Sequence, residues 1–325
     1  MENNFSKNVS EKNNMKISVC ICSYNGENYI AEQLNSIVNQ TMKVDEIILS
    51  DDKSTDKTTQ IAENILKNSG IDYKILINEK NQGVTKNFEN SCSHATGDII
   101  FFSDQDDIWM ANKVERICNE FAQNENAQLV FSNAELFDEN GVYKDTSWDR
   151  FGFKINDSIF KKSQLTYILG RWFVTGATMA AKKSLLNECL PFNDKFLHDH
   201  ILSFVACCHN AVFPVNEKLI KYRQHSNQVV GIIKKNTFSE KAKTKVNYDG
   251  AIESMELYRE LVRQYLNDNK ALEIIDDKCA FLQKRKEYKK YNRFVRFFKC
   301  VMLLPKYKLY QVSPLGSFLK DVIYK

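Results

Sequence analysis

The chain lacks any apolar run long enough to cross a membrane. Its longest near-continuous runs are Ile17–Cys22, Ile99–Phe102 and Ile201–Cys208, whereas a membrane-spanning helix needs about 20 residues. The first residues are rich in Asn, Lys and Ser and contain no apolar stretch typical of a secretory signal. We therefore expect a disordered leader at residues 1–14 and a cytoplasmic protein that is either soluble or bound to a membrane surface.

Paired cysteines and glycine-rich loops are also missing. None of the nine cysteines forms a C-x-x-C pair, and most lie within apolar runs, where a free thiol behaves as a small core side chain. This pattern predicts reduced thiols. No glycine-rich phosphate-binding fingerprint follows any predicted strand, which argues against a dinucleotide-binding Rossmann domain and against a P-loop.

The remaining composition is that of an ordinary globular protein. The 325 residues are 43% hydrophobic and 26% charged, which excludes collagen-like and wholly disordered chains. The net charge of +4 hides an asymmetry, because residues 281–310 contain ten basic side chains and one acid, Glu287. That segment carries +9, residues 311–325 carry +1, and residues 1–280 therefore sum to −6. Such a contrast suggests two parts with different partners.

Strand patterns alternate with helical patterns along the first half of the chain. The predicted strands are Lys16–Ser23, Val44–Ser50, Tyr73–Ile77, Asp98–Ser103 and Leu129–Ser132. A segment with helical spacing of apolar residues separates each strand from the next. This order predicts an α/β fold with a mostly parallel, doubly wound sheet. In such sheets, ligands bind beyond the carboxyl ends of the strands.

The later sequence is less regular. We expect a hairpin around Glu139–Gly141, a β-type run at Trp172–Ala181, a helix at His198–His209 and short strands at Ala211–Val215 and Leu219–Arg223. Beyond Thr237 the pattern is helical to about Leu304. We therefore predict one α/β domain over residues 15–235 and a helical extension over residues 236–325.

Three carboxylates follow the predicted strand Asp98–Ser103. Asp104, Asp106 and Asp107 occupy a four-residue loop, where they repel one another unless a cation or hydrogen-bond donors compensate their charge. Hard oxygen ligands of this kind suit Mg²⁺ or Mn²⁺, which can neutralise the diphosphate of a departing nucleotide. The alternative is a solvated acidic loop that caps the helix starting near Ile108.

A second acidic strand end spans Asp51–Asp56. Part of this run is expected to cap the helix that begins at Thr58. A carboxylate fixed at a strand end can also accept hydrogen bonds from a base or a ribose hydroxyl of a nucleotide. The two interpretations are compatible, because different side chains would serve each.

These motifs occur together in the order found in the family 2 glycosyltransferases. The sequence SYN at residues 23–25 ends the first strand, DDKSTD at 51–56 the second, and DQDDIW at 104–109 the fourth. Residues 174–180, 198–200 and 222–225 continue the match. Over residues 15–232 the chain resembles the rhamnosyltransferase-like bacterial subgroup that builds capsule and lipopolysaccharide O-antigen. The resemblance implies a GT-A fold and a nucleotide-sugar donor.

The resemblance implies roles for the residues that end the first two strands. Ser23, Tyr24 and Asn25 would flank the nucleotide, with Tyr24 stacked or packed beside the base. Asp52 would bind the base, and Asp51 would help to shape that pocket.

It also implies a metal site in the acidic loop. Asp104 and Asp106 would form the Asp-x-Asp element that holds Mn²⁺ or Mg²⁺ and the nucleotide-sugar. Asp107 would support these two ligands or cap the following helix. Gln105 departs from the pattern of many relatives, which have a small residue between the acids. In the segment that ends with His225, Arg223 would pair with the diphosphate, and His225 would bind the diphosphate or the metal. The plainer interpretation is a surface arginine and a loop histidine.

The base of the reaction is assigned by the same resemblance. Inverting transfer needs a carboxylate within hydrogen-bond reach of the acceptor hydroxyl, and Asp199 matches the family's acid at the start of a helix. The alternative is an acid that only stabilises the helix dipole. Thr175, Gly176 and His198 would line the acceptor pocket.

The implied function is inverting transfer of rhamnose, galactose or a similar sugar from a UDP- or dTDP-sugar to a lipid-linked or oligosaccharide acceptor. A nucleotidyltransferase is an alternative, although it would use a glycine-rich basic loop near the first strand. A catalytically inactive saccharide- or membrane-binding module is another, although it would lack the base or the metal-binding acids.

The basic segment suggests a further partner. Residues 288–310 interleave aromatic and aliphatic side chains with Lys and Arg, a pattern typical of helices that lie on anionic membranes. We therefore expect peripheral contact with the inner face of the cytoplasmic membrane. The alternative is a helix that packs on the catalytic domain with a solvated basic face. No recognisable motif supports nucleic-acid binding.

Overall fold

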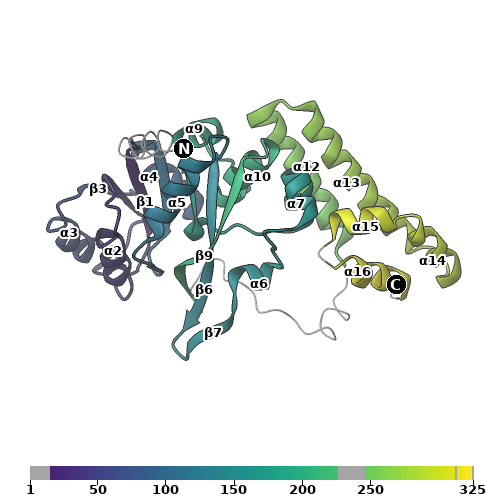
Figure 1. Ribbon diagram of the computed structural model, residues 1–325, viewed down its shortest axis with the longest axis horizontal. Helices are drawn as coiled ribbons and strands as arrows, with labels where there is room; N and C mark the ends of the chain where they lie inside the picture. The colour runs from purple at the N-terminus through teal and green to yellow at the C-terminus, as the bar shows by residue number, and fades with distance from the viewer. Residues whose placement is uncertain (1–14, 226–245, 312, 324–325) are drawn as a thin grey trace, which may run out of the picture. The chain divides into compact units, whose positions relative to one another are not determined.

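The computed structural model describes residues 15–225, 246–311 and 313–323, and the predicted leader lies outside these ranges (Figure 1). Contacts divide the chain into two compact units. The described residues up to 149 and those from 174 to 225 form the first unit, and residues 150–173 join those from 246 onward in the second. Within the described ranges, no helix is both long and apolar enough to span a bilayer.

The first unit is built on one mixed sheet. Its strands in spatial order are β3 (Asp72–Ile77), β2 (Glu46–Asp51), β1 (Ile17–Ser23), β4 (Ile99–Asp104), β8 (Met179–Lys182), β6 (Leu129–Asp138), β9 (Val212–Arg223) and β5 (Ile108–Trp109), with β7 (Gly141–Thr146) paired to β6. The first four are parallel, whereas β8 pairs antiparallel with both β4 and β6. The predicted α/β fold class is confirmed.

Helices connect the strands of this sheet. They are α2 (Ile30–Val38), α3 (Thr58–Leu66), α4 (Val84–His94), α5 (Lys113–Gln123), α6 (Ser147–Phe151), α9 (Lys183–Cys189) and α10 (His198–Cys208), with a 3₁₀ turn η1 (Gly176–Thr178). Every residue of β1 and β2 is buried. Parallel strands that are covered on both faces have nearly continuous apolar sequences, which explains the apolar runs at these positions. None of the nine cysteines forms a disulfide, in agreement with the prediction of reduced thiols.

Two expected strands differ from those observed. The two short strands expected at residues 211–215 and 219–223 belong to one strand, β9, which begins at Val212. Extra residues of β9 bulge opposite Ser132–Ala134 of β6, so the strand continues through its polar middle. The run Trp172–Ala181 enters the sheet only at Met179, because Gly176–Thr178 coil into η1. The predicted hairpin around Glu139–Gly141 is the β6–β7 turn.

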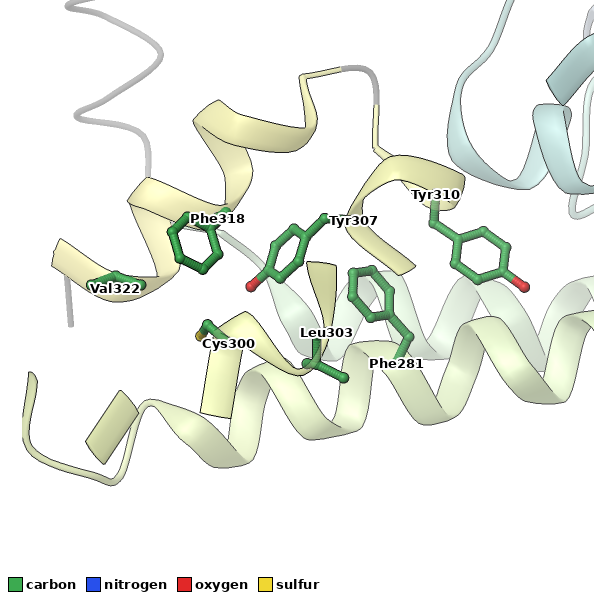
Figure 2. Close-up of a cluster of buried hydrophobic side chains, with 7 residues drawn as sticks. All are labelled: Phe281, Cys300, Leu303, Tyr307, Tyr310, Phe318 and Val322. Atoms are coloured by element: carbon green, nitrogen blue, oxygen red, sulfur yellow. The ribbon is translucent and has the colours of Figure 1, made fainter. Parts of the chain in front are cut away.

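The second unit is helical. Its helices are α7 (Ser158–Lys162), α8 (Gln164–Gly170), α12 (Tyr248–Leu261), a π-helical turn η2 (Val262–Leu266), α13 (Asn269–Tyr288), α14 (Arg293–Val301), α15 (Leu304–Tyr310) and α16 (Pro314–Ile323). Figure 2 shows one of its apolar clusters, made of Phe281, Cys300, Leu303, Tyr307, Tyr310, Phe318 and Val322. The tail helices α14, α15 and α16 thus pack against α13 in a core of their own.

A charged network is buried in this unit. Asp321 is 1% exposed and accepts hydrogen bonds from Arg285, Tyr248 and Tyr307, with Lys289 at 3.6 Å. A buried carboxylate is tolerated when it is paired and hydrogen-bonded in this way. Arg296 is buried too, so part of the basic segment serves the fold and not the surface.

Candidate active site

The sheet register places the predicted strand ends side by side. β1 lies between β2 and β4, so that Cys22 is opposite Asp104 and Ser23 is opposite Asp51. Burial and then the charges of Asp104 and Asp52 are among the causes that raise the pKa of the Cys22 thiol. The carboxylates that follow β2 and β4 therefore lie near the same end of β1, at the carboxyl edge where α/β proteins bind ligands.

Asp51 is fully engaged within this edge. Its carboxylate accepts hydrogen bonds from Ser23 Oγ at 2.7 Å, from Ser54 N at 2.7 Å and from Ser54 Oγ at 2.6 Å, and the residue is completely buried. Asp51 therefore shapes the edge by holding the loop after β2 against the end of β1.

Asp52 organises a different loop. Its carboxylate accepts from Asn78 Nδ2 at 2.9 Å and from the backbone N–H groups of Gln82 and Gly83, both at 2.8 Å. Asn78 and Gln82 also line a pocket of about 490 Å³. This carboxylate already accepts hydrogen bonds from three donors within the protein. If it also contacts a nucleotide base, as predicted, it would do so in addition to holding this loop.

Gln105 forms two hydrogen bonds with the loop after β1. Its Oε1 accepts from Tyr24 N at 2.9 Å, and its Nε2 donates to Tyr24 O at 3.0 Å. A Cβ on Gly26 would come within 2.1 Å of Gln105 Oε1, so the glycine makes room for this side chain. The departure from the family pattern thus has a structural role, which is to couple the acidic loop to Tyr24. The Tyr24 ring remains 48% exposed.

Asn25 ties the loop after β1 to the loop after β2. It adopts a positive φ of 48°, its N–H donates to Ser54 Oγ at 2.8 Å, and its Oδ1 accepts from Thr55 N at 2.9 Å. The SYN and DDKSTD motifs therefore form one hydrogen-bonded unit.

The acidic loop holds more negative charge than its surroundings compensate. Burial, followed by the charges of Asp106 and Asp199, raises the pKa of Asp104 to about 7. Burial and the charges of Asp106 and Asp104 raise the pKa of Asp107 well above its usual range. Asp107 Oδ1 accepts from Arg223 N at 2.9 Å, whereas its buried Oδ2 has no partner among the described residues. A cation would relieve this arrangement.

The end of β9 returns to the acidic loop. His225 Nε2 lies 2.7 Å from Asp106 Oδ2, and the His225 ring stacks on Tyr29 with centroids 5.1 Å apart. Arg223 donates to Asp106 O at 2.7 Å and to Glu32 Oε2 at 2.6 Å. The structure therefore brings both predicted residues to the acids, and Arg223 would have to leave Glu32 to meet a diphosphate. Residues 226–228 lie outside the described ranges.

Asp199 and Gly176 are joined directly. Asp199 is in the first turn of α10, where its Oδ2 accepts from Gly176 N at 3.0 Å and its Oδ1 accepts from His200 N at 2.8 Å. Because Asp199 also contributes to the raised pKa of Asp104, the predicted base and the predicted metal ligands converge on one region. Thr175 precedes this contact and accepts at its carbonyl from Thr178 Oγ1 at 2.8 Å.

His198 is buried against aromatic rings. Its centroid lies 3.8 Å from Phe88 and 5.5 Å from Phe102, and neither ring nitrogen has a hydrogen-bond partner among the described residues. A Cβ on Gly176 would come 2.7 Å from His198 Nε2. Burial lowers the pKa of this imidazole to about 4, so it is a neutral group packed against Gly176.

Lys113 is a residue that sequence reasoning missed. It is fully buried in α5, its ammonium group donates to Ala177 O at 2.6 Å, and it lies 3.9 Å from the centroid of Trp109. Burial lowers the pKa of Lys113 to about 7, although the charges of Asp107 and Asp104 act to raise it. The sequence shows only that a lysine follows the acidic loop by six residues. The fold shows that its positive charge lies close enough to compensate these acids.

The residues present fit a divalent cation in part. Among the described residues, no three His, Cys, Asp or Glu side chains are arranged as a metal site. However, Asp106 and His225 are within 2.7 Å of each other, and Asp107 has an orphaned buried oxygen. This donor chemistry suits Mn²⁺ or Mg²⁺.

The sequence matches a known protein family. Residues 18–190 match the family described as glycosyl transferase family 2. The dTDP-rhamnosyl transferase RfbG of Shigella flexneri is 32% identical over 228 residues, which cover 65% of this chain and 73% of that protein. The UDP-Glc:alpha-D-GlcNAc-diphosphoundecaprenol beta-1,3-glucosyltransferase WfgD of Escherichia coli is 27% identical over 219 residues, or 66% and 79% of the two chains.

A solved structure shares the fold. The crystal structure of S. aureus TarS residues 1–349 in complex with UDP-GlcNAc superposes with a TM-score of 0.58 at 21% identity, covering 95% of this chain and 82% of that one. At this identity the similarity establishes the fold alone.

Proposed function

The chain belongs to glycosyl transferase family 2 and is a glycosyltransferase, and we propose that it is an inverting enzyme of bacterial surface polysaccharide synthesis. It moves a sugar such as rhamnose or galactose from a UDP- or dTDP-sugar to a lipid-linked or saccharide acceptor. The observation that carries the proposal is the meeting of Asp199 with Gly176 beside the acidic loop.

Asp199 is the proposed catalytic base. Its carboxylate accepts hydrogen bonds from two backbone N–H groups, those of Gly176 and His200, which fix its orientation. In an inverting reaction this carboxylate takes the proton of the acceptor hydroxyl as that oxygen attacks the anomeric carbon. Thr175, Gly176 and His198 are the proposed acceptor contacts on the same side.

The nucleotide is proposed to bind at the ends of β1 and β2. The exposed ring of Tyr24 is available to lie beside the base, and the backbone that carries it is held by Gln105. Ser23 and Asn25 flank this position, and Asp52 is the proposed base contact. Arg223 is proposed to pair with the diphosphate.

Asp104, Asp106 and His225 are the proposed ligands of Mn²⁺ or Mg²⁺. When bound there, a divalent ion would supply positive charge to the leaving diphosphate and would help to orient the donor. The protein's contribution is to hold Asp106 and His225 within 2.7 Å of each other, next to a buried oxygen of Asp107 that has no partner among the described residues.

The nature of the acceptor is proposed from relatives. WfgD acts on a diphosphoundecaprenol-linked sugar, which supports a lipid-linked acceptor here. An enzyme with such an acceptor works at a membrane, so we also propose peripheral contact of the basic C-terminal segment with the inner face of the cytoplasmic membrane.

A donor screen tests the proposal. UDP- and dTDP-sugars are added to the full chain with and without Mn²⁺, and thermal stabilisation and slow donor hydrolysis are measured. We expect one nucleotide class to raise the melting temperature only when Mn²⁺ is present. If no nucleotide-sugar stabilises or is hydrolysed under either condition, the transferase proposal is wrong.

A further inference from the structure

Helix α14 exposes a continuous apolar side. Phe294 is 74% exposed and Met302, directly after the helix, is 79% exposed. The other exposed apolar residues of this helix are Phe297, Phe298 and Val301. Their spacing of three or four residues places them on one side, whereas Arg296 and Cys300 are buried. The core therefore uses one side of α14 and leaves an aromatic side without cover.

Helix α16 repeats this arrangement beside it. Leu315, Leu319 and Ile323 are exposed at steps of four residues, while Phe318 and Val322 point into the cluster of Figure 2. The Phe297 and Phe318 rings lie 6.0 Å apart, so the two helices adjoin. We call the exposed apolar residues of α14 and α16, with Met302, the apolar surface. Exposed patches of this kind mark interaction sites in proteins.

The segment that carries the apolar surface has almost only basic charged side chains. From residue 288 to the end of the chain the only acid is Asp321, which is buried in the network with Arg285. Lys290, Arg293 and Lys308 are exposed. A second copy of the chain would bring these cations together, which costs energy. An anionic lipid surface complements both the cations and the apolar side chains.

We propose that the apolar surface inserts into the interface of an anionic bilayer. This deepens the membrane contact proposed above, and it assigns the main contribution to insertion of apolar side chains and not to the +9 charge of the basic segment. Phe294, Phe298 and Met302 enter the boundary between headgroups and acyl chains, and the neighbouring Lys and Arg side chains contact lipid phosphates. Trp and Phe side chains on amphipathic helices bind in this manner.

The first test is flotation of the full chain with vesicles. Vesicles of phosphatidylcholine with 30% phosphatidylglycerol are compared with phosphatidylcholine alone, using the parent and the triple variant Phe294→Ser, Phe298→Ser and Met302→Ser. We expect the triple variant to bind anionic vesicles at least ten-fold more weakly. Val142→Ser removes an exposed apolar side chain from β7 of the first unit and should bind like the parent. Equal binding of the triple variant and the parent overturns the proposal.

The second test separates insertion from charge and from self-association. The variant Arg293→Gln with Lys308→Gln should lose only a few-fold in affinity and should keep residual binding at high salt. A larger loss than in the triple variant overturns the primacy of insertion. If light scattering shows a parent dimer that the triple variant converts to a monomer, with no vesicle binding by either, the surface is a protein interface and the proposal fails. Donor-induced thermal stabilisation, measured in every variant, reports separately on the transferase function.

Discussion

Asp321 of the helical unit and the acidic loop of the α/β unit differ in how their buried charge is compensated. In the helical unit, Asp321 is surrounded by donors from Arg285, Tyr248 and Tyr307, and nothing about it is unsatisfied. In the α/β unit, Asp104 and Asp107 are crowded with like charges, and one buried oxygen of Asp107 has no partner.

This difference distinguishes structural charge from functional charge. A satisfied buried ion pair holds helices in place, whereas an acidic cluster whose charge is only partly compensated is costly and persists where a ligand completes it. The comparison predicts that substitutions in the two networks will have separable effects, on stability in one unit and on binding and catalysis in the other.

The largest effect is expected at Asp199. Asp199→Asn keeps an oxygen that can accept from Gly176 N but removes the base, so transfer should fall about 10²- to 10⁴-fold while donor binding is unchanged. A transfer assay and calorimetry with the donor measure the two quantities. Asp194→Asn, at an exposed position of the same segment, is the control. Unchanged turnover of Asp199→Asn would remove the base assignment.

Asp321→Asn should cause the largest loss of stability. It leaves the Arg285 guanidinium buried without its counter-charge, which costs about 3–5 kcal/mol. Chemical denaturation should show the helical unit unfolding earlier, with donor binding retained before that transition. Glu273→Gln, an exposed change on α13, is expected to have little effect. A wild-type denaturation curve for Asp321→Asn contradicts the structural role.

Asp106→Ala should weaken binding without unfolding the chain. We expect the Mn²⁺-dependent part of donor affinity to fall about 10- to 100-fold, or roughly 1.4–2.7 kcal/mol. Calorimetry with and without Mn²⁺ measures that part. Asp145→Ala, on β7, is the exposed control. Retention of the full Mn²⁺ effect in Asp106→Ala would argue against the metal role.

Lys113→Met sharpens the comparison by removing the buried compensating charge. The acidic loop then depends more on an added cation for charge compensation. Mn²⁺ should therefore raise the melting temperature of the variant by several degrees more than that of the parent. A few degrees correspond to about 1 kcal/mol for a chain of this size. Thermal melts across a Mn²⁺ series measure this. An equal shift in both proteins would show that Lys113 does not compensate the acids.

The smallest effect concerns pH and Lys278. Burial, followed by the charges of Arg285 and Arg171, lowers the pKa of Lys278 to about 7. Its folded pKa is below its unfolded value of about 10.4, so the unfolded chain holds more protons between these values and stability rises with pH there, by at most about 1.4 kcal/mol per unit.

Lys278→Met should flatten this rise. The measurement is the difference in unfolding free energy between parent and variant at pH 7, 8 and 9, with the exposed Lys270→Met as the control. A difference that stays constant over this range would mean that Lys278 is charged in the folded protein.

Local patterns predicted much of the fold. The parallel strands β1 to β4 follow from short, buried apolar runs between helical segments, and α10 was expected almost to its observed ends. The continuous strand β9 and the turn at Gly176 were not expected, because a bulge of β9 against β6 and the hydrogen bond to Asp199 decide them. The grouping of residues 150–173 with the C-terminal helices likewise depends on contacts distant in sequence.

The candidate site shows the same division. The motifs pointed to Asp104, Asp106 and Asp199 as candidates, because an acidic residue at the end of a predicted strand or helix can be recognised from its neighbours in the sequence. The roles of Gln105 and Lys113 were not visible, since each acts on a segment many residues away, at Tyr24 and at Ala177.

By itself, then, the amino-acid order determined the α/β class, the family and the stretches that carry the chemistry, because periodicity and short motifs are properties of neighbouring residues. Only the tertiary structure decided which charges are compensated and which apolar side chains are left exposed. Compensation requires groups such as Tyr248 and Asp321, which lie 73 residues apart in the chain, and burial depends on every element that packs nearby.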